Sequence, residues 1–182
     1  MTNTAYTDSV RGIWTIENVL SGDECQALIG KSEQAGYEPA TMNYFGGAVA
    51  RPDIRNNDRV IWDDPLYAER LWAILSPHVP QSLGDRYAVG LNERFRLYRY
   101  DPGQKFAPHI DGSYRSPTGA QSMLTLLVYL NDGFEGGETD VDGVAISPQT
   151  GKALLFRHQL LHEGVEIRSG RKYVLRSDVM YL

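Results

Sequence analysis

The sequence is poor in cysteine, has no long apolar run and has no cluster of basic residues. Cys25 is the only cysteine among 182 residues, so no disulfide can form within the chain, which is typical of a reducing compartment. The longest apolar stretch, residues 123–130, is far too short to span a bilayer. Residues 1–10 are polar and lack the apolar segment of a secretory signal. We therefore expect a cytoplasmic protein with no membrane partner.

The charge balance argues against nucleic acid as a partner. The 23 acidic residues outnumber the 18 lysines and arginines, and the formal net charge is -5. Nucleic-acid binding depends on clustered cations, and the sequence has none. The length suffices for one domain with a complete hydrophobic core. We expect a single domain over residues 1–182, with its motif-bearing core at about 88–182.

Two helices are expected in the first half of the chain. Ser21 and Glu24 form a capping-box pattern, which predicts a helix over residues 21–35. Asp64, followed by a proline, predicts the start of a second helix that ends before Pro77. The expected inward side chains of this second helix are Leu66, Leu71, Ile74 and Leu75.

The second half of the chain has the pattern of strands. Residues 94–100 alternate, with Phe95 and Leu97 expected on one face and the residues between them on the other. Three apolar runs of strand length follow, at 123–130, 152–156 and 173–180. Helices followed by short strands indicate a mainly β, α+β domain. We expect the N-terminal helices to pack on one sheet, and a β-sandwich or barrel to carry the chemistry.

The segment His109-Ile110-Asp111 carries the clearest chemical signal. In an extended segment, residues two apart point to the same side, so His109 and Asp111 would enter one cavity. His162 follows another apolar strand and supplies a second imidazole. Two histidines and one carboxylate form a facial triad with open coordination positions, which is the arrangement of non-haem Fe(II) oxygenases. We expect these three residues to be both the metal ligands and the catalytic centre.

Two other histidines are available in the chain. His158 and His162 lie four residues apart, as in a two-histidine metal face on a helix, but no glutamate follows His158 as in the His-Glu-x-x-His motif. We therefore expect His158 to be an exposed or capping loop residue. His78, next to a proline at the end of the second helix, is expected to face solvent.

Two cations share one face of the last expected strand. Lys172 and Arg176 would point the same way, with Val174 between them. Burying two cations on a mostly apolar strand is costly unless an anion meets them. This pattern predicts a buried dianionic ligand beside the metal site. The alternative is that both cations lie on the solvent-exposed face of an edge strand.

Several further motifs follow one another in order around these residues. They are Tyr100-Asp101-Pro102-Gly103-Gln104, the threonine-containing strand 124–131, Gly136-Gly137-Glu138-Thr139, the strand 151–156, His162-Glu163-Gly164 and Gly170-Arg171-Lys172-Tyr173. This series resembles the prolyl-4-hydroxylase-like branch of the Fe(II)- and 2-oxoglutarate-dependent oxygenases. Residues 16–36 and 55–62 are also similar to the opening helix and to an arginine-rich segment of that family.

This resemblance implies a double-stranded β-helix, or jelly-roll, with the ligands inside it. It implies Fe(II) as the metal, 2-oxoglutarate and O2 as co-substrates, and ascorbate as an optional reductant. Lys172 would bind the distal carboxylate of 2-oxoglutarate, and Tyr100, Thr125 and Tyr129 would line its pocket. Arg176 departs from the family, which needs only one basic residue on this strand. It either shares the co-substrate or reaches a polar or anionic substrate.

The reaction implied by the resemblance is hydroxylation of an unactivated C–H bond, with release of succinate and CO2. Halogenating members lose the metal-binding carboxylate, whereas Asp111 is present here. Two alternatives stay open. One is a non-catalytic jelly-roll module that binds metal or 2-oxoglutarate as a sensor. The other is a cupin-like protein with a different metal, although such sites usually carry more histidines.

The sequence leaves three substrate classes open: a peptidyl proline, an amino acid or another small molecule. Two loops, 41–57 and 112–121, are expected to flank the entrance and to carry specificity. The candidates for substrate contact are Arg55, Asp58, Arg59, Trp62 and Arg115. The alternative for each is ordinary surface charge or, for the tryptophan, a place in the core.

Overall fold

The computed structural model describes residues 6–44, 47–49 and 51–182, so residues 45, 46 and 50 of the expected entrance loop lie outside the described chain. The helices are α1 (Gly22–Ala35), α2 (Pro65–Leu75) and a short 3-10 helix, η1 (Ser76–His78). The strands are β1 (Tyr6–Asp8), β2 (Ile13–Ile16), β3 (Glu38–Pro39), β4 (Met42–Tyr44), β5 (Gly47–Val49), β6 (Asp58–Asp63), β7 (Ser82–Leu83), β8 (Arg86–Leu91), β9 (Arg94–Tyr100), β10 (Phe106–His109), β11 (Gln121–Tyr129), β12 (Glu135–Gly136), β13 (Thr139–Val141), β14 (Val144–Ile146), β15 (Ala153–Arg157), β16 (His162–Gly164), β17 (Ile167–Ser169) and β18 (Lys172–Tyr181).

Both helices begin at the capping residues that the sequence predicts. The Ser21 hydroxyl accepts a hydrogen bond from the backbone N–H of Glu24, and the Glu24 carboxylate accepts one from the backbone N–H of Ser21. The Asp64 carboxylate accepts a hydrogen bond from the backbone N–H of Tyr67. These bonds satisfy N–H groups that have no partner within the helix.

The inward face of α2 differs from the prediction. Leu71 and Leu75 are buried, but Leu66 and Ile74 are exposed. Ala68 completes the buried stripe, because it lies three residues before Leu71 and the stripe continues four residues later. Leu66 lies five residues before Leu71 and falls outside that stripe.

No helix in the described part of the chain has the length and apolar character needed to cross a bilayer.

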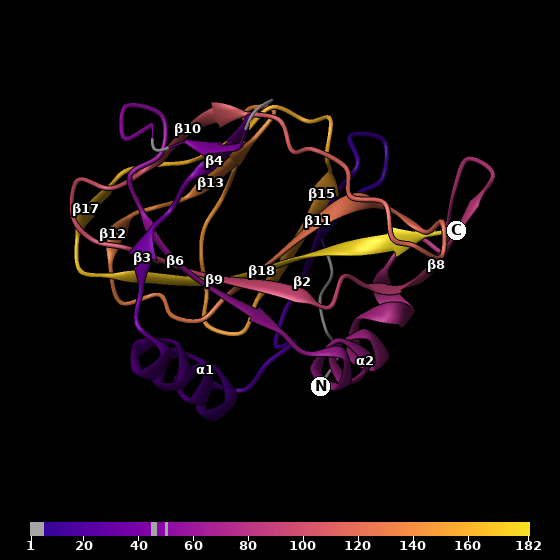
Figure 1. Cartoon of the computed structure of the whole chain (residues 1–182), viewed down its shortest axis with the longest axis horizontal. Helices are drawn as coiled ribbons and strands as arrows, with labels where there is room; N and C mark the ends of the chain where they lie inside the picture. The colour runs from indigo at the N-terminus through magenta and orange to yellow at the C-terminus, as the bar shows by residue number, and fades with distance from the viewer. Residues whose placement is uncertain (1–5, 45–46, 50) are drawn as a thin grey trace.

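Two main antiparallel sheets form the body of the molecule (Figure 1). The larger has the order β1-β2-β15-β11-β18-β9-β6-β3, and β8 also pairs with β18. The smaller has the order β10-β16-β13-β14. Strands far apart in sequence are neighbours, since β2 pairs with β15 and β11 pairs with β18. This is the jelly-roll core expected from the sequence.

The larger sheet buries apolar side chains on both faces. Phe95 and Leu97 of β9 belong to one hydrophobic cluster, together with residues of α1 and α2. Both helices lie along this side of the sheet (Figure 1). Tyr98 and Tyr100 belong to a second cluster, which includes Val141 of the smaller sheet. The predicted alternation of β9 is therefore confirmed, and its second face looks into the space between the sheets.

Candidate metal and co-substrate site

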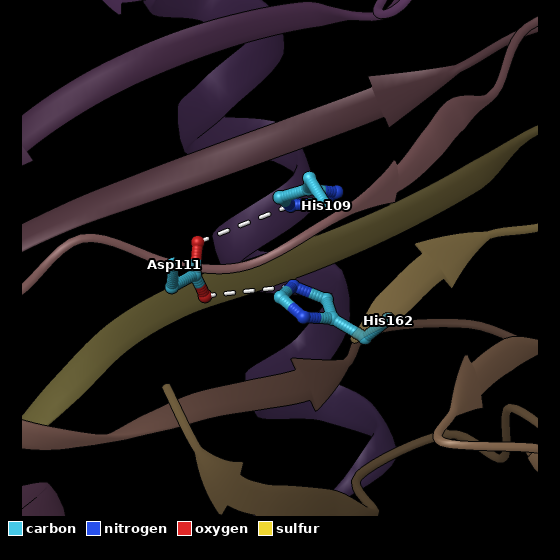
Figure 2. A group of neighbouring side chains, drawn as sticks. All are labelled: His109, Asp111 and His162. Atoms are coloured by element: carbon cyan, nitrogen blue, oxygen red, sulfur yellow. Dashed lines mark ion pairs between the residues drawn. The ribbon is translucent and has the colours of Figure 1, made fainter. Parts of the chain in front are cut away.

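Three predicted metal ligands meet at the smaller sheet. His109 ends β10, His162 begins β16, and the two are paired across these antiparallel strands. Asp111 lies two residues beyond the end of β10. Its carboxylate faces both imidazoles (Figure 2), with 3.9 Å between Oδ1 and Nε2 of His109 and 3.5 Å between Oδ2 and Nε2 of His162. One donor atom from each side chain lies within 4.8 Å of the others, which is close enough for the three to share an ion.

Backbone carbonyls fix the orientation of both imidazoles. Nδ1 of His109 lies 2.8 Å from the carbonyl oxygen of Ala107, and Nδ1 of His162 lies 3.0 Å from that of Leu160. Because a carbonyl only accepts, Nδ1 carries the proton in each ring and Nε2 presents a lone pair. Burial lowers the pKa of His109 to about 4 and also lowers the pKa of His162, so both rings are neutral at pH 7. Neutral imidazole is the form that binds metals.

Asp111 is held as an ionised carboxylate. Its Oδ2 accepts a hydrogen bond of 2.5 Å from the Thr125 hydroxyl and lies 3.1 Å from Nη2 of Arg176. Burial raises the pKa of Asp111, but the charge of Arg176 and the hydrogen bond from Thr125 outweigh it, and the pKa lies well below its usual range. Among the hydrogen bonds between described residues, none reaches Oδ1. Oδ1 is therefore the oxygen available to a metal.

A chain of hydrogen bonds behind Asp111 involves a residue that the sequence places wrongly. His158 is buried rather than exposed. Its Nδ1 lies 2.9 Å from the Thr125 hydroxyl and its Nε2 lies 3.0 Å from the Ser122 hydroxyl. Because the Thr125 hydroxyl donates to Asp111, it accepts from Nδ1–H of His158, and Nε2 then accepts from Ser122. His158 therefore supports the carboxylate from behind and is not one of the three converging side chains.

The backbone completes this support. The backbone N–H of Asp111 donates to the carbonyl oxygen of His158 at 3.0 Å. The orientation of Asp111 thus depends on a contact with the loop after β15 and not on a continued β10 strand. His78, by contrast, is partly buried in η1, far in sequence from this network and outside the group of converging ligands.

Lys172 is a buried cation with little to neutralise it. Its side chain is almost fully buried, and its ammonium donates a hydrogen bond of 2.6 Å to the carbonyl oxygen of Gly137. No carboxylate of the described residues lies within ion-pair distance of Nζ. Burial lowers the pKa of Lys172 to about 7. A bound carboxylate would restore its charge, so this group fits the distal end of a dicarboxylic acid.

The three residues expected to line the co-substrate pocket have different roles. Tyr100 and Thr125 line the cavity, and the Tyr100 ring lies 5.4 Å from Nζ of Lys172. Thr125 also bonds to Asp111, as described above. Tyr129 is fully buried and its hydroxyl donates to Thr139 at 2.8 Å, and the centre of its ring, like that of Tyr100, lies 5.4 Å from Nζ of Lys172. Thr139, the last residue of the Gly136-Gly137-Glu138-Thr139 motif, also lines the cavity.

Arg176 faces the same space as Lys172, which confirms the shared face predicted for the last strand. Its side chain is 12% exposed, and Nη2 lies 3.1 Å from Asp111 and 3.2 Å from Oδ1 of Asp178. Both cations are therefore buried, and the alternative of a solvent-exposed edge is wrong. Arg176 contacts a predicted metal ligand, whereas Lys172 does not.

A cavity of about 520 Å³ connects these groups with the surface. The three expected ligands, Lys172 and Arg176 all line it. Two of the candidate substrate residues, Arg55 and Arg59, also line it, as do Gly112, Ser113 and Tyr114 of the second expected entrance loop. Arg55 is buried, and its guanidinium carbon lies 4.4 Å from the ring centres of Tyr98 and Phe106.

The other three substrate candidates, Asp58, Trp62 and Arg115, are not among the residues that line the cavity. Asp58 and Trp62 pair with Arg99 and Phe95 on β9, whose side chains point away from the space between the sheets. Asp58 forms an ion pair with Arg99, and Trp62 packs on Phe95. Arg115 is exposed and hydrogen bonds to Gln121. Strand parity explains the split, because Asp58 and Trp62 lie on one face of β6, whereas Arg59 lies on the other and pairs with Tyr98, which lines the cavity.

Comparison with known proteins agrees with this geometry. A model of the 2OG-Fe(II) oxygenase superfamily matches residues 95–177. Prolyl 4-hydroxylase 1 of Arabidopsis thaliana is 26% identical over 194 residues, covering 88% of this chain and 66% of that protein. Probable prolyl 4-hydroxylase 3 of the same plant is 32% identical over 165 residues, covering 76% of this chain and 55% of that protein. The chain thus spans only part of the length of these relatives.

Solved structures share the fold. The viral collagen prolyl hydroxylase of Paramecium bursaria Chlorella virus-1, in its 2OG complex, has a TM-score of 0.67 at 22% identity, covering 96% of this chain and 99% of that one. A Trichoplax adhaerens prolyl hydroxylase in complex with a hypoxia inducible factor peptide has a TM-score of 0.75 at 19% identity, covering 94% and 84%.

The ordered motifs, the jelly-roll and the converging His-Asp-His set agree with these matches. Two imidazole nitrogens and one carboxylate oxygen are a donor set suited to non-haem iron, and Lys172 suits a dicarboxylate. The family model, the relatives and the shared fold together support a prolyl-4-hydroxylase-like 2OG-Fe(II) oxygenase, and the donor set and Lys172 fit Fe(II) and 2-oxoglutarate.

Proposed function

We propose that this protein is a 2-oxoglutarate-dependent hydroxylase in which His109, Asp111 and His162 hold Fe(II) and Lys172 binds the distal carboxylate of 2-oxoglutarate. The observation that carries the proposal is the convergence of the three donor atoms within 4.8 Å of one another. They line a cavity that is also lined by Lys172, a buried lysine with no carboxylate partner among the described residues. Iron and 2-oxoglutarate, when bound, supply the oxidising chemistry: a C–H bond and O2 give a C–OH group, while 2-oxoglutarate gives succinate and CO2.

The chain's own residues supply orientation and a dry site. The carbonyls of Ala107 and Leu160 hold both Nε2 atoms toward the centre. Thr125 and Arg176 keep Asp111 ionised and turn Oδ1 toward the same point. Phe106 stacks on the His109 ring, with 3.5 Å between ring centres, and excludes water from that side. These hydrogen bonds hold the three donor side chains in orientations that face one another, which favours specific ligation.

The substrate proposal follows the relatives, which are named as prolyl hydroxylases. We place a peptidyl proline, an amino acid or another small molecule in the outer part of the cavity. The Trichoplax neighbour is recorded with a peptide, which supports a peptide as one member of this set. Ascorbate would serve as the reductant that keeps the iron in the Fe(II) state.

The direct test is anaerobic calorimetric titration of 2-oxoglutarate into the protein, with and without Fe(II). We expect iron-dependent binding in the wild type, and none for His109→Ala, Asp111→Ala or His162→Ala. His78→Ala is the matched control, because it removes an imidazole outside the site. Candidate substrates are then screened with O2 for succinate and for a product heavier by one oxygen atom. Iron-dependent 2-oxoglutarate binding without succinate from any candidate would favour the sensor alternative instead.

A further inference from the structure

The cavity carries more positive charge than iron and 2-oxoglutarate account for. Six cationic side chains line it: Arg55, Arg59, Arg94, Arg96, Lys172 and Arg176. The lining carboxylates are Asp111, Glu163 and Asp178. Arg94 is already paired with Asp63 outside the cavity, so five cations face three carboxylates. The charges of Fe(II) and the 2-oxoglutarate dianion cancel, and the cationic excess therefore persists in the loaded site.

Two of the arginines oppose each other directly. Arg96 of β9 and Arg176 of β18 are paired positions on neighbouring antiparallel strands, and both face the cavity. Like charges directly opposite each other destabilise a sheet. Asp178 compensates Arg176 at 3.2 Å, but Nη1 of Arg96 lies 4.0 Å from that carboxylate and has no hydrogen-bond partner among the described residues.

A third guanidinium that lines the cavity, that of Arg55, also has an N–H group without a hydrogen-bond acceptor in the described chain. Arg55 is 7% exposed and its Nε donates to the Asn57 side chain at 2.7 Å, but its Nη2 is buried without a partner among the described residues. The Tyr98 hydroxyl is affected by the charges of all three arginines. Burial raises the pKa of the Tyr98 hydroxyl, but Arg55, Arg176 and Arg96 together lower it below its ordinary value. A buried guanidinium N–H without an acceptor is costly, and an anion would satisfy it.

2-Oxoglutarate bound as proposed has no free carboxylate left for Arg55 and Arg96. Lys172 and Arg176 are four residues apart on one strand, which separates their backbones by about 13 Å. The distal carboxylate bound by Lys172 and the keto-acid end bound by the metal account for both charged ends of the molecule. Arg96, opposite Arg176, therefore keeps its unpartnered N–H when the co-substrate is present.

We propose that the substrate carries a carboxylate, and that Arg55 and Arg96 bind it in the outer part of the cavity. This inference rests on the proposed hydroxylase function and narrows its substrate class to acids, such as a free or N-acylated amino acid, or a peptide that presents its carboxylate to the site. Guanidinium groups suit this role because their planar N–H pairs match the two oxygens of a carboxylate.

The test uses acid and amide pairs of equal shape: acetate and acetamide, benzoate and benzamide, and N-acetyl-L-proline and its amide. Each is titrated anaerobically by calorimetry into the Fe(II) protein saturated with 2-oxoglutarate. We expect at least one acid to bind about tenfold or more tightly than its amide. Arg55→Gln and Arg96→Gln should each reduce that affinity about tenfold, which is the size expected for one charged hydrogen bond.

Arg99→Gln is the matched control, because Arg99 lies on the same strand but points outward to Glu33 and Asp58. It should leave acid binding unchanged. The ligand-free Arg96→Gln protein should melt no lower than the wild type, since the change relieves repulsion from Arg176; a purely structural arginine would give a lower melting temperature. The inference is overturned if acids and amides bind alike in all three pairs, or if the Arg55→Gln/Arg96→Gln double variant keeps acid binding. Failure of 2-oxoglutarate itself to bind would overturn the proposed function instead.

Discussion

Replacing Lys172 with methionine should stabilise the ligand-free fold and weaken 2-oxoglutarate binding at the same time. Burial lowers the pKa of Lys172 from 10.5 to about 7. Each pKa unit corresponds to about 1.4 kcal/mol, so burial of this ammonium costs the fold roughly 4–5 kcal/mol at pH 7. Methionine has a similar length and removes this cost, but it also loses the hydrogen bond to Gly137, worth about 1–3 kcal/mol. We expect the unfolding free energy to rise by about 1–4 kcal/mol.

The pH dependence of this effect has a definite sign. Because the pKa of Lys172 is lower in the fold than in the unfolded chain, the unfolded chain binds the extra proton between pH 7 and pH 10.5. The cost is complete below pH 7 and disappears as the pH rises to 10.5. Stability of the wild type should therefore rise across this window, and the Lys172→Met variant should lack that contribution.

Binding should change in the opposite direction. Leaving the distal carboxylate of 2-oxoglutarate without its cation in a buried site costs on the order of 3–5 kcal/mol, which raises the Kd at least about 100-fold. Urea unfolding followed by circular dichroism and anaerobic calorimetry measure the two effects. Lys105→Met is the control, because Lys105 is exposed. A loss of stability with unchanged 2-oxoglutarate affinity would refute the reasoning, and a larger loss of affinity in Arg176→Met would assign the carboxylate to Arg176.

Two further predictions concern the metal ligands. Thr125→Val keeps the side-chain volume but removes the hydrogen bond to Asp111, so Fe(II) affinity should fall about 10–100-fold in an anaerobic metal titration. Ser122→Ala should have a smaller effect, because Ser122 is two hydrogen bonds further from Asp111 than Thr125. An unchanged affinity in Thr125→Val would contradict the positioning role. For His109, burial lowers the pKa from 6.5 to about 4, so the unfolded chain binds more protons between pH 4 and 6.5 and the metal-free protein should lose stability as the pH falls through that range. His109→Gln should flatten this slope in urea titrations at several pH values, and an identical slope would show that His109 is not the group responsible.

Local patterns in the sequence predict the parts of the site that depend on strand parity. Lys172, Val174 and Arg176 alternate inward on β18, as two-residue periodicity requires. Parity could also have separated Arg59 from Trp62, since the two differ by an odd number of positions. What the sequence does not contain is which strand lies beside β6, and only its pairing with β9 shows which parity faces the cavity.

Long-range contacts account for two features of the site that local patterns do not predict. His158 lies in a loop, and loops are usually exposed. Its burial follows from the pairing of β11 with β15, which brings Thr125 opposite Phe156 and therefore close to the loop that begins two residues later. Tyr129 points to the same side of β11 as Thr125, but its hydroxyl is bound by Thr139 of the smaller sheet. Neither contact has a signal in the local sequence.

The two faces of β9 divide stability and chemistry between them. Phe95 and Leu97 are at most 1% exposed, and burial of each contributes about 1.5–3 kcal/mol. The opposite face carries Arg96 and Tyr98, whose charges and hydroxyl are costly to bury. A slip of one residue would exchange the two faces, so the apolar pair penalises every shift by an odd number of residues. Burial of Phe95 and Leu97 on the opposite face therefore keeps Arg96 on the cavity face, although it lies there directly opposite the like-charged Arg176.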